Sequence, residues 1–209
     1  MNAKKNDNLF GRHVREVKFD EFNLETERFS LEHLLDSEEN LALIEKFSAP
    51  NNAAGLENYL KYSAFDDEKR NYGRTYLVKD KSTGEIVCYF SLRTGLITMQ
   101  VSDSPERFET IPAIELSNFA VDTRYRERHA IAKKIGFLMF NYFIMPLVRE
   151  LAKYVGVNAL YIYALPNERL IGHYKTMGFS RLSPEDEKFV QKHVKPEYDE
   201  GCVFMYQTV

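Results

Sequence analysis

The sequence predicts one domain of the α+β class, in which helices flank a mixed and mostly antiparallel sheet. The first observation behind this is the order of predicted elements. Helices come first, an antiparallel run of strands follows, and strand, helix, strand, helix, strand complete the chain. The second is size, since 209 residues with 44% hydrophobic side chains suffice for one sizeable core. This order contains a single parallel crossover, and ligands usually bind beside such a crossover.

The N-terminal third is predicted to be mainly helical. An edge strand is expected over residues 12–19, and apolar side chains at helical spacing predict a helix over residues 29–47. A second helix is predicted from Gly55, and the charged residues 64–70 after it are expected to form a loop.

An antiparallel hairpin is predicted next. Residues 75–79 and 85–92 are rich in β-branched and aromatic side chains, and Asp80, Ser82 and Gly84 between them suit a tight turn. This part of the sheet is therefore a meander and not a βαβ unit.

The central strand is predicted over residues 113–121, preceded by a short strand over 96–101 and a polar loop over 102–110. The apolar pattern then predicts a long buried helix over residues 131–155, which Pro146 should kink or locally break.

Strands and helices are predicted to alternate in the C-terminal part of the chain. A strand over residues 159–165 leads into a helix over 167–177 that Gly178 ends. A short charged helix and a last strand over residues 202–207 follow.

Composition excludes several classes of protein. With 28 Lys and Arg against 31 Asp and Glu, the net charge of -3 gives no broad nucleic-acid-binding surface and leaves a local basic groove as the alternative. The opening residues lack an apolar leader, and the apolar stretch 137–148 is shorter than the roughly 20 residues that span a bilayer, so a cytoplasmic protein without membrane contact is expected. Cys88 and Cys202 are too few for a disulfide framework or a metal clip and are expected to be buried thiols.

Three segments resemble a known family. IELSNFAVD (residues 114–122), the helix containing Gly136, and NERLIGHYKTMGF (residues 167–179) are together similar to the GNAT superfamily of acyl-CoA-dependent N-acyltransferases. The resemblance covers about residues 75–179. It implies a splayed pair of parallel strands, acetyl-CoA as co-substrate, no metal, and direct attack of an amine in a ternary complex.

The resemblance also assigns roles to single residues. Backbone N–H groups near Phe119, Ala120 and Val121 would bind the pantetheine arm and polarise the thioester carbonyl. Tyr174 would protonate the departing thiolate or, alternatively, only pack and hold the cofactor. Asn167 would contact the cofactor or cap its helix.

A general base is needed as well, because amines are mostly protonated at neutral pH. Glu115 on the central strand is the candidate, with an ion-paired or solvent-facing glutamate as the alternative. His173 is next to Tyr174 in sequence, but adjacent helical residues point about 100° apart, so it is not expected to share the site.

The phosphate-binding loop departs from the family's pattern of closely spaced glycines. If Arg126 is aligned with its first residue, His129 and Ile131 stand at glycine positions. In the preferred alignment the glycine segment corresponds to Lys134, Ile135 and Gly136. Positive charge that would compensate for missing backbone contacts is expected from Arg126, Arg128, Lys133 and Lys134.

The acceptor is expected to bind beside residues 29–70. The main expectation is an acyltransferase acting on groups other than aminoacyl groups, with a primary amine of a small molecule or peptide as acceptor. One alternative rests on residues 55–92, which resemble toxins that acetylate the amino group of aminoacyl-tRNA. A non-catalytic acyl-CoA-binding module is a third reading, and the resemblance also allows a homodimer.

Overall fold

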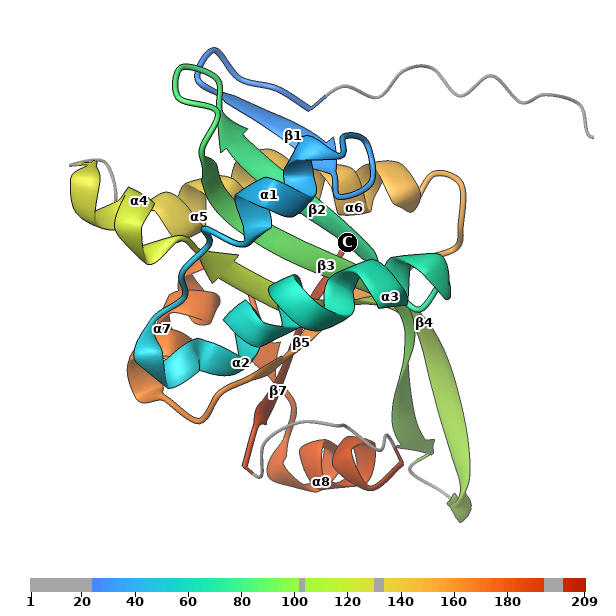
Figure 1. Ribbon diagram of the computed structural model, residues 1–209. Helices are drawn as coiled ribbons and strands as arrows, with labels where there is room; N and C mark the ends of the chain where they lie inside the picture. Colours follow the sequence, from blue (N-terminus) through green and yellow to red (C-terminus); the bar gives the residue numbers. More distant parts are fainter. Residues whose placement is uncertain (1–23, 102–103, 130–133, 194–200) are drawn as a thin grey trace, which may run out of the picture.

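A computed structural model of the protein describes residues 24–101, 104–129, 134–193 and 201–209. Seven strands form one sheet in the order β1-β2-β3-β4-β5-β7-β6 (Figure 1). Their bounds are β1 Phe29–His33, β2 Arg74–Asp80, β3 Ile86–Val101, β4 Ser104–Val121, β5 Ala159–Ala164, β6 Ser180–Arg181 and β7 Val203–Thr208. Among the strands of these described ranges, only β4 and β5 pair in parallel. The predicted α+β class with one parallel pair in a mostly antiparallel sheet is confirmed.

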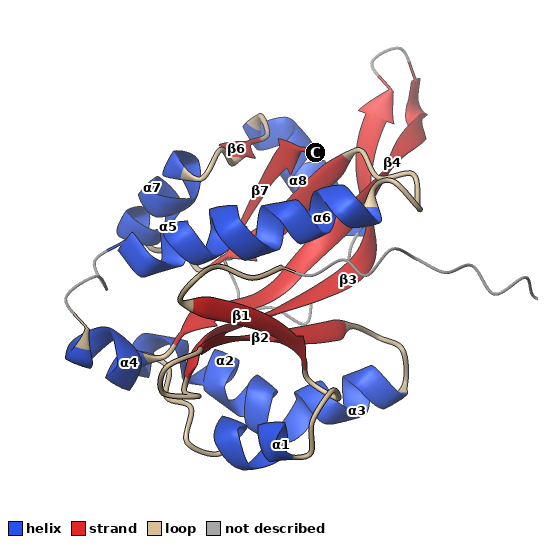
Figure 2. Cartoon of the chain, turned by 90° about the horizontal axis from the view of Figure 1, so that it is seen from above, coloured by secondary structure: helices blue, strands red, loops and turns tan. Residues whose placement is uncertain are grey.

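Helices cover both faces of this sheet (Figure 2). On one face lie α1 (Glu39–Ile44), α2 (Ala54–Asn58) and α3 (Ala64–Lys69), and on the other α5 (Ile135–Met139) and α6 (Met145–Leu151). The remaining helices are α4 (Thr123–Arg128), α7 (Glu168–Thr176) and α8 (Pro184–His193). A 3-10 turn spans Asn51–Ala53, and π-helical turns span Tyr59–Ser63 and Phe140–Ile144.

The two faces of the sheet each pack against a separate hydrophobic core. Tyr89 and Phe90 are neighbours on β3, and because successive strand residues point to opposite faces they belong to different cores. Phe90 packs in the larger core with Phe140, whereas Tyr89 packs in the smaller core beneath α1 to α3, where its ring meets Phe47 edge-on.

At Pro146, where a kink or local break was predicted, the helix changes type and continues without interruption. Pro146 stands in the first turn of α6, and the π-helical turn Phe140–Ile144 joins it to α5. Proline cannot donate a backbone hydrogen bond, so a widened turn before it keeps the helix continuous.

Three predicted elements differ from the structure. Phe29–His33 is an edge strand paired with β2 and not the start of a helix, because residues with apolar side chains two apart suit a strand as well as a helix. The charged stretch that was expected to be a loop forms α3, whose buried face carries Ala64 and Glu68. The strand predicted over residues 12–19 lies outside the described residues.

The third difference concerns the long hairpin of β3 and β4. The polar residues from Ser104 to Thr110 continue β4 and pair with β3 up to Val101, so they are not a loop. At the base of this hairpin a third hydrophobic cluster joins Ile97 to Val190 of α8 and Phe204 of β7. The hairpin therefore projects from the sheet beside α8 (Figure 1).

No helix in the four described ranges is long and apolar enough to cross a membrane.

Candidate active site

The parallel pair of strands separates after a short stretch. β4 pairs with β5 only at Ala113, Ile114 and Glu115, although β4 continues to Val121 and β5 to Ala164. Beyond Glu115, β4 keeps its partner β3, and β5 keeps its partner β7. The two strands therefore open into a V whose branch point is Glu115.

A β-bulge lies at this branch point. Leu116 pairs with Leu92 and Asn118 with Ser91, so Ser117 is an extra residue in β4. Its hydroxyl donates to the carbonyl of Ser91 at 3.2 Å. A bulge bends and twists its strand, which explains why β4 leaves β5 here while it stays paired with β3.

The hydrogen-bond alternation of β4 then decides which backbone groups face the open side. Asp122 N–H donates to the Val87 carbonyl at 2.9 Å, so Ala120, two residues earlier, also directs its backbone polar groups toward β3. Phe119 and Val121 consequently direct theirs toward the gap between β4 and β5.

A cavity of about 1980 Å³ occupies this gap. Its lining residues come from α2 and α3, from the strands β3, β4 and β5, and from α4, α5 and α7. We call the part lined by Tyr59, Asp67, Tyr72, Arg93 and Glu115 the α3 end, and the part lined by Arg126, His129, Gly136, Arg169 and His173 the α4–α7 end. Tyr174 also lines the cavity.

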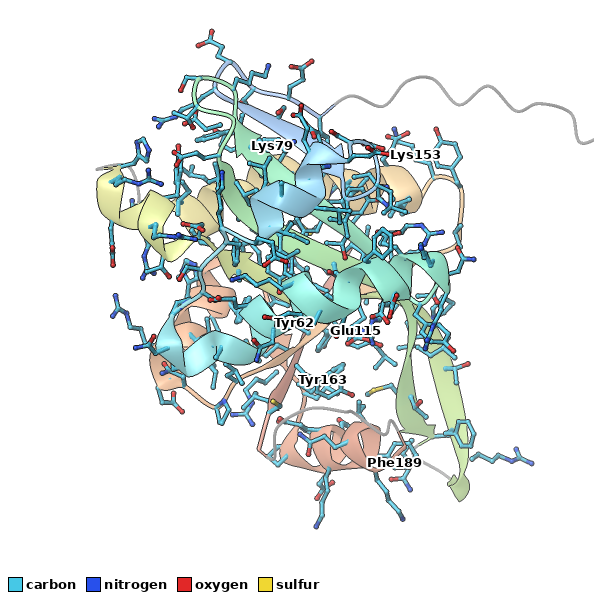
Figure 3. All side chains as sticks on the ribbon, in the orientation of Figure 1. Tyr62, Lys79, Glu115, Lys153, Tyr163 and Phe189 are labelled. Carbon is cyan, nitrogen blue, oxygen red and sulfur yellow. The ribbon has the colours of Figure 1, made fainter. Side chains whose placement is uncertain are left out.

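Glu115 is the most buried ionisable side chain of the α3 end, 8% exposed, and lies near the centre of the molecule in Figure 3. The hydroxyl of Tyr161 donates to Oε2 at 3.4 Å, and Oε1 has no hydrogen-bond partner among the described residues. Burial raises the pKa of Glu115, although Arg93 and Tyr161 act in the opposite direction. The site thus holds a poorly solvated carboxyl group with one unpaired oxygen.

Arg93 of β3 pairs with Glu115 of β4. The sequence did not indicate this neighbour. Its guanidinium nevertheless bonds Asp67 of α3, with Nη2 3.0 Å from Oδ2, and the Tyr59 hydroxyl donates to the same oxygen at 3.1 Å. Glu115 therefore has a positive charge nearby and no direct ion pair with it.

Tyr174 and Asn167 lie on α7. Tyr174 is half-buried, packs edge-on against Phe179 with ring centroids 5.6 Å apart, and burial raises its pKa to about 12. Asn167 caps the helix, because its Oδ1 accepts from Leu170 N–H at 3.1 Å. Gly178, with φ of 98°, ends it in the left-handed conformation that glycine adopts easily.

His173 shares the cavity with Tyr174, which corrects the expectation that it would not. The cavity is wide enough to be lined by two adjacent helical residues. A Cβ at Gly136 would lie 3.4 Å from Nε2 of His173 and 3.8 Å from Cγ2 of Val121. α5 therefore begins close to both the open strand and α7, and burial lowers the pKa of His173.

The residues expected around the phosphates are separated by the structure. Arg126, Ile135 and Gly136 line the cavity. Arg128 does not, because its Nη2 pairs with Oε1 of Glu85 at 2.7 Å on the β2–β3 hairpin. Lys134 is exposed at the start of α5. Lys133 lies outside the described residues.

Sequence reasoning also missed a buried polar network behind α4. Asp80, whose side chain is fully buried, accepts from the Tyr125 hydroxyl at 2.5 Å and from Arg28 Nε at 3.1 Å. Burial alone would raise the pKa of Asp80, but bonds from Ser82, Tyr125 and Arg28 hold it well below its ordinary value. Arg28 Nη2 also reaches the Tyr125 oxygen at 2.9 Å and His129 Nδ1 at 3.3 Å. The sequence did not indicate this network because its residues come from three distant segments, around positions 28, 80 and 125.

No group of three or more His, Cys, Asp and Glu side chains within the described ranges could hold a metal ion.

Comparison with known proteins finds similar folds among solved structures. No family model matches the sequence, and no curated protein matches it. Among solved structures, a tyrosine-to-phenylalanine variant of KacT matches with a TM-score of 0.61 and 17% identity over 87% of this chain and 95% of KacT. AtaTR bound with acetyl-CoA matches with a TM-score of 0.58 and 18% identity, over 88% of this chain and 94% of the other.

A third structure is AtaT complexed with acetyl-methionyl-tRNAfMet, with a TM-score of 0.60 and 17% identity over 86% of this chain and 94% of AtaT. At these identities the likeness establishes the fold, and the predicted resemblance to the GNAT fold is confirmed. The expectation of an enzyme acting on groups other than aminoacyl groups is wrong, because a protein of this fold holds an acetylated aminoacyl-tRNA.

Proposed function

We propose that the protein is an N-acetyltransferase that transfers the acetyl group of acetyl-CoA to the amino group of an aminoacyl-tRNA. The main support for the proposal is one observation: Glu115, at the point where β4 separates from β5, lines the same cavity as Tyr174. A buried carboxyl group and a protonated phenol on one cavity provide a base and an acid for acyl transfer.

The cavity residues fit acetyl-CoA. Unpaired backbone groups of Phe119 and Val121 would hold the pantetheine arm and bond the thioester carbonyl, as strand edges do with extended ligands. Ala120 lies between them and would support their position. Arg126 and the start of α5 at Lys134, Ile135 and Gly136 would lie along the phosphates, and acetyl-CoA supplies an activated acetyl group.

Glu115 would act as the general base. The incoming ammonium group must lose a proton before its nitrogen can bond to the acetyl carbon, and Oε1 has no competing partner in the described part of the chain. The raised pKa of Glu115 makes this carboxylate a stronger base than an exposed glutamate. The proton passes from the amine to Glu115 directly or through one water.

Tyr174 would act as the acid. As the bond between the acetyl carbon and sulfur breaks, the electron pair stays on sulfur, and the phenol donates its proton to that thiolate. A pKa of about 12 keeps the phenol protonated at neutral pH. The attached nitrogen loses its second proton to solvent as the amide forms. Glu115 then releases its proton to solvent and Tyr174 regains one, so one proton is released overall for each acetyl group transferred.

An aminoacyl-tRNA acceptor is supported by two observations. AtaT, which covers most of this chain at a TM-score of 0.60, was solved with acetyl-methionyl-tRNAfMet. Tyr62 and Tyr72 are 74% and 63% exposed, Tyr72 lines the α3 end of the cavity, and exposed tyrosines suit the unstacked bases of a tRNA acceptor end. Tyr62 lies on the helix that covers this end (Figure 3).

The organisation proposed with this function is a single GNAT-like domain over residues 1–209. The cofactor would contact the core of about residues 75–179, and the acceptor would bind on the side of residues 29–70. Acting on tRNA would place the enzyme in the cytoplasm.

Acetyl transfer from radiolabelled acetyl-CoA tests the proposal, with aminoacyl-tRNA, uncharged tRNA and a pool of free amines as acceptors. Label in charged tRNA alone is the expected result. Label only in free amines would identify a small-molecule or peptide acceptor instead. Calorimetric binding of acetyl-CoA with no transfer to any acceptor would identify a non-catalytic acyl-CoA-binding module.

A further inference from the structure

The buried network behind α4 has a closed pattern of donors and acceptors. Arg28 donates from Nε to Asp80 and from Nη2 to the Tyr125 oxygen, while Tyr125 donates its own proton to Asp80. Nη2 has a second proton, and His129 Nδ1 lies 3.3 Å from it. The His129 ring also stacks on Tyr125, with centroids 4.1 Å apart and planes 28° apart.

This pattern determines the tautomer of His129. A guanidinium group has five donors and no acceptor, so the bond between Arg28 and His129 can only form if Nδ1 accepts. The ring proton must then be on Nε2. Because Tyr125 covers one face of the ring and Arg28 occupies the Nδ1 edge, the edge carrying Nε2–H is left for the cavity that His129 lines.

The surroundings of His129 favour an anion. Arg126 and Arg169 line the same end of the cavity and make no ion pair within the described ranges, and Glu127 is the acidic side chain that lines this end. His129 also stands where one alignment with the family's phosphate-binding loop requires a glycine. A side-chain N–H directed into the cavity can replace the backbone N–H groups that closely spaced glycines would expose.

We propose that His129, fixed by Arg28 in the Nε2–H tautomer, donates a hydrogen bond to a phosphate oxygen of the bound coenzyme. This inference rests on the proposed function, because the phosphate is that of acetyl-CoA. Arg28 does not touch the ligand and acts as a positioning residue through His129.

A matched pair of variants separates the two nitrogens. His129→Asn keeps an oxygen near Nδ1 for Arg28 and loses the donor at Nε2. His129→Gln places an amide donor near Nε2 and loses the Nδ1 acceptor. Calorimetric titration should show CoA affinity about tenfold weaker for His129→Asn, as expected for one charge-assisted hydrogen bond, and less than about threefold weaker for His129→Gln.

Truncated ligands then identify the phosphate. Pantetheine, which has no phosphate, should bind the unmodified protein and His129→Asn equally. A deficit that persists with dephospho-CoA assigns the bond to the diphosphate, and one that disappears assigns it to the 3′-phosphate. Equal CoA affinities of the two variants, or an equal deficit with pantetheine, would overturn the inference alone. Absence of CoA binding by the unmodified protein would overturn the proposed function.

Nitrogen-15 NMR of the histidine rings provides a test that does not depend on folding of the His129 variants. The unmodified protein should show His129 as the Nε2–H tautomer, and Arg28→Met should convert it to a mixture while lowering CoA affinity. An Nδ1–H tautomer in the unmodified protein, or an unchanged tautomer in Arg28→Met, would contradict the role of Arg28.

Discussion

The two ends of the cavity hold charge in different ways. At the α3 end the charged groups are fixed by one another: Arg93 bonds Asp67, Tyr59 bonds the same carboxylate, and Glu115 is buried beside them. At the α4–α7 end Arg126 and Arg169 are exposed, whereas His129 is fixed by a network that lies outside the cavity.

This difference matches the chemistry proposed for each end. Proton transfer needs a base whose pKa and position are set in advance, which burial and fixed neighbours achieve. Exposed arginines can bind phosphates through long-range electrostatic attraction. Loss of a single contact then lowers the binding affinity only a little. Substitutions of Glu115 and Tyr174, the proposed base and acid, should therefore affect rate strongly, and those of the residues proposed to lie along the phosphates should affect affinity more weakly.

The largest effect is expected for Tyr174→Phe. Loss of the acid should lower kcat about 1000-fold, within the range for removal of a general acid, while acetyl-CoA affinity and melting temperature stay unchanged. Single-turnover kinetics and calorimetry measure the two quantities. Tyr142→Phe, an exposed tyrosine away from the cavity, is the matched control. An unchanged kcat would remove Tyr174 as the acid.

Glu115→Gln should lower the rate about 100-fold at neutral pH. A base works when ionised, so the rate of the unmodified enzyme should fall as the pH drops through the pKa of Glu115, which burial places above the ordinary glutamate value of about 4.3. The pH dependence of kcat/KM should lose this acid limb in the variant.

Stability provides the control for Glu115→Gln. Because the folded pKa of Glu115 is raised, any stability that its neutral form contributes is present at low pH and lost as the pH rises through that pKa. The neutral glutamine should therefore not destabilise the protein at pH 7. An unaltered pH profile in a folded variant would leave Glu115 with a structural role only.

Gly136→Leu should weaken acetyl-CoA binding about tenfold with a smaller effect on kcat. Its Cβ would already contact His173 and Val121, so the rest of the side chain must occupy the cavity. Gly156→Ala, where a Cβ meets nothing within 4 Å, is the control and should bind normally. Unchanged affinity of Gly136→Leu would show that the phosphates lie elsewhere.

The smallest effect is expected for Asn167→Ala. Loss of the cap on α7 should lower the free energy of unfolding by about 1 kcal/mol, with kinetic constants unchanged at temperatures where the variant is folded. Denaturant unfolding measures this change. A raised KM for acetyl-CoA without loss of stability would instead indicate a cofactor contact.

Much of the fold followed from local patterns. The segment 167–179 carries a cap, an amphipathic helix and a glycine in positive φ, and each of these signals is contained in a few neighbouring residues. The hairpin of β2 and β3 was predictable for the same reason. The strand Phe29–His33 was not predictable, because its conformation depends on pairing with β2, which is distant in sequence.

The site was predictable only in part. Glu115 and Tyr174 came from motifs, and both line the cavity. The position of Arg93 opposite Glu115 depends on the register between β3 and β4, which no local sequence pattern predicts. The contact of Arg28 with His129 joins residues about a hundred positions apart, so no local pattern predicts it. In the sequence, a histidine at a glycine position of the phosphate-binding loop was interpreted only as a departure from the family's pattern.

Ser117 is the extra residue of β4, so deleting it would remove the bulge and shorten the strand by one residue. Leu116 and Asn118 already face consecutive residues of β3, so a chain lacking Ser117 could keep every pairing on that side. A straightened β4 would then be able to hydrogen-bond to the rest of β5, and the space for a ligand would close. The opening beside β5 thus depends on the single extra residue of β4 between Leu116 and Asn118, and deletion of Ser117 should abolish ligand binding while leaving a folded protein.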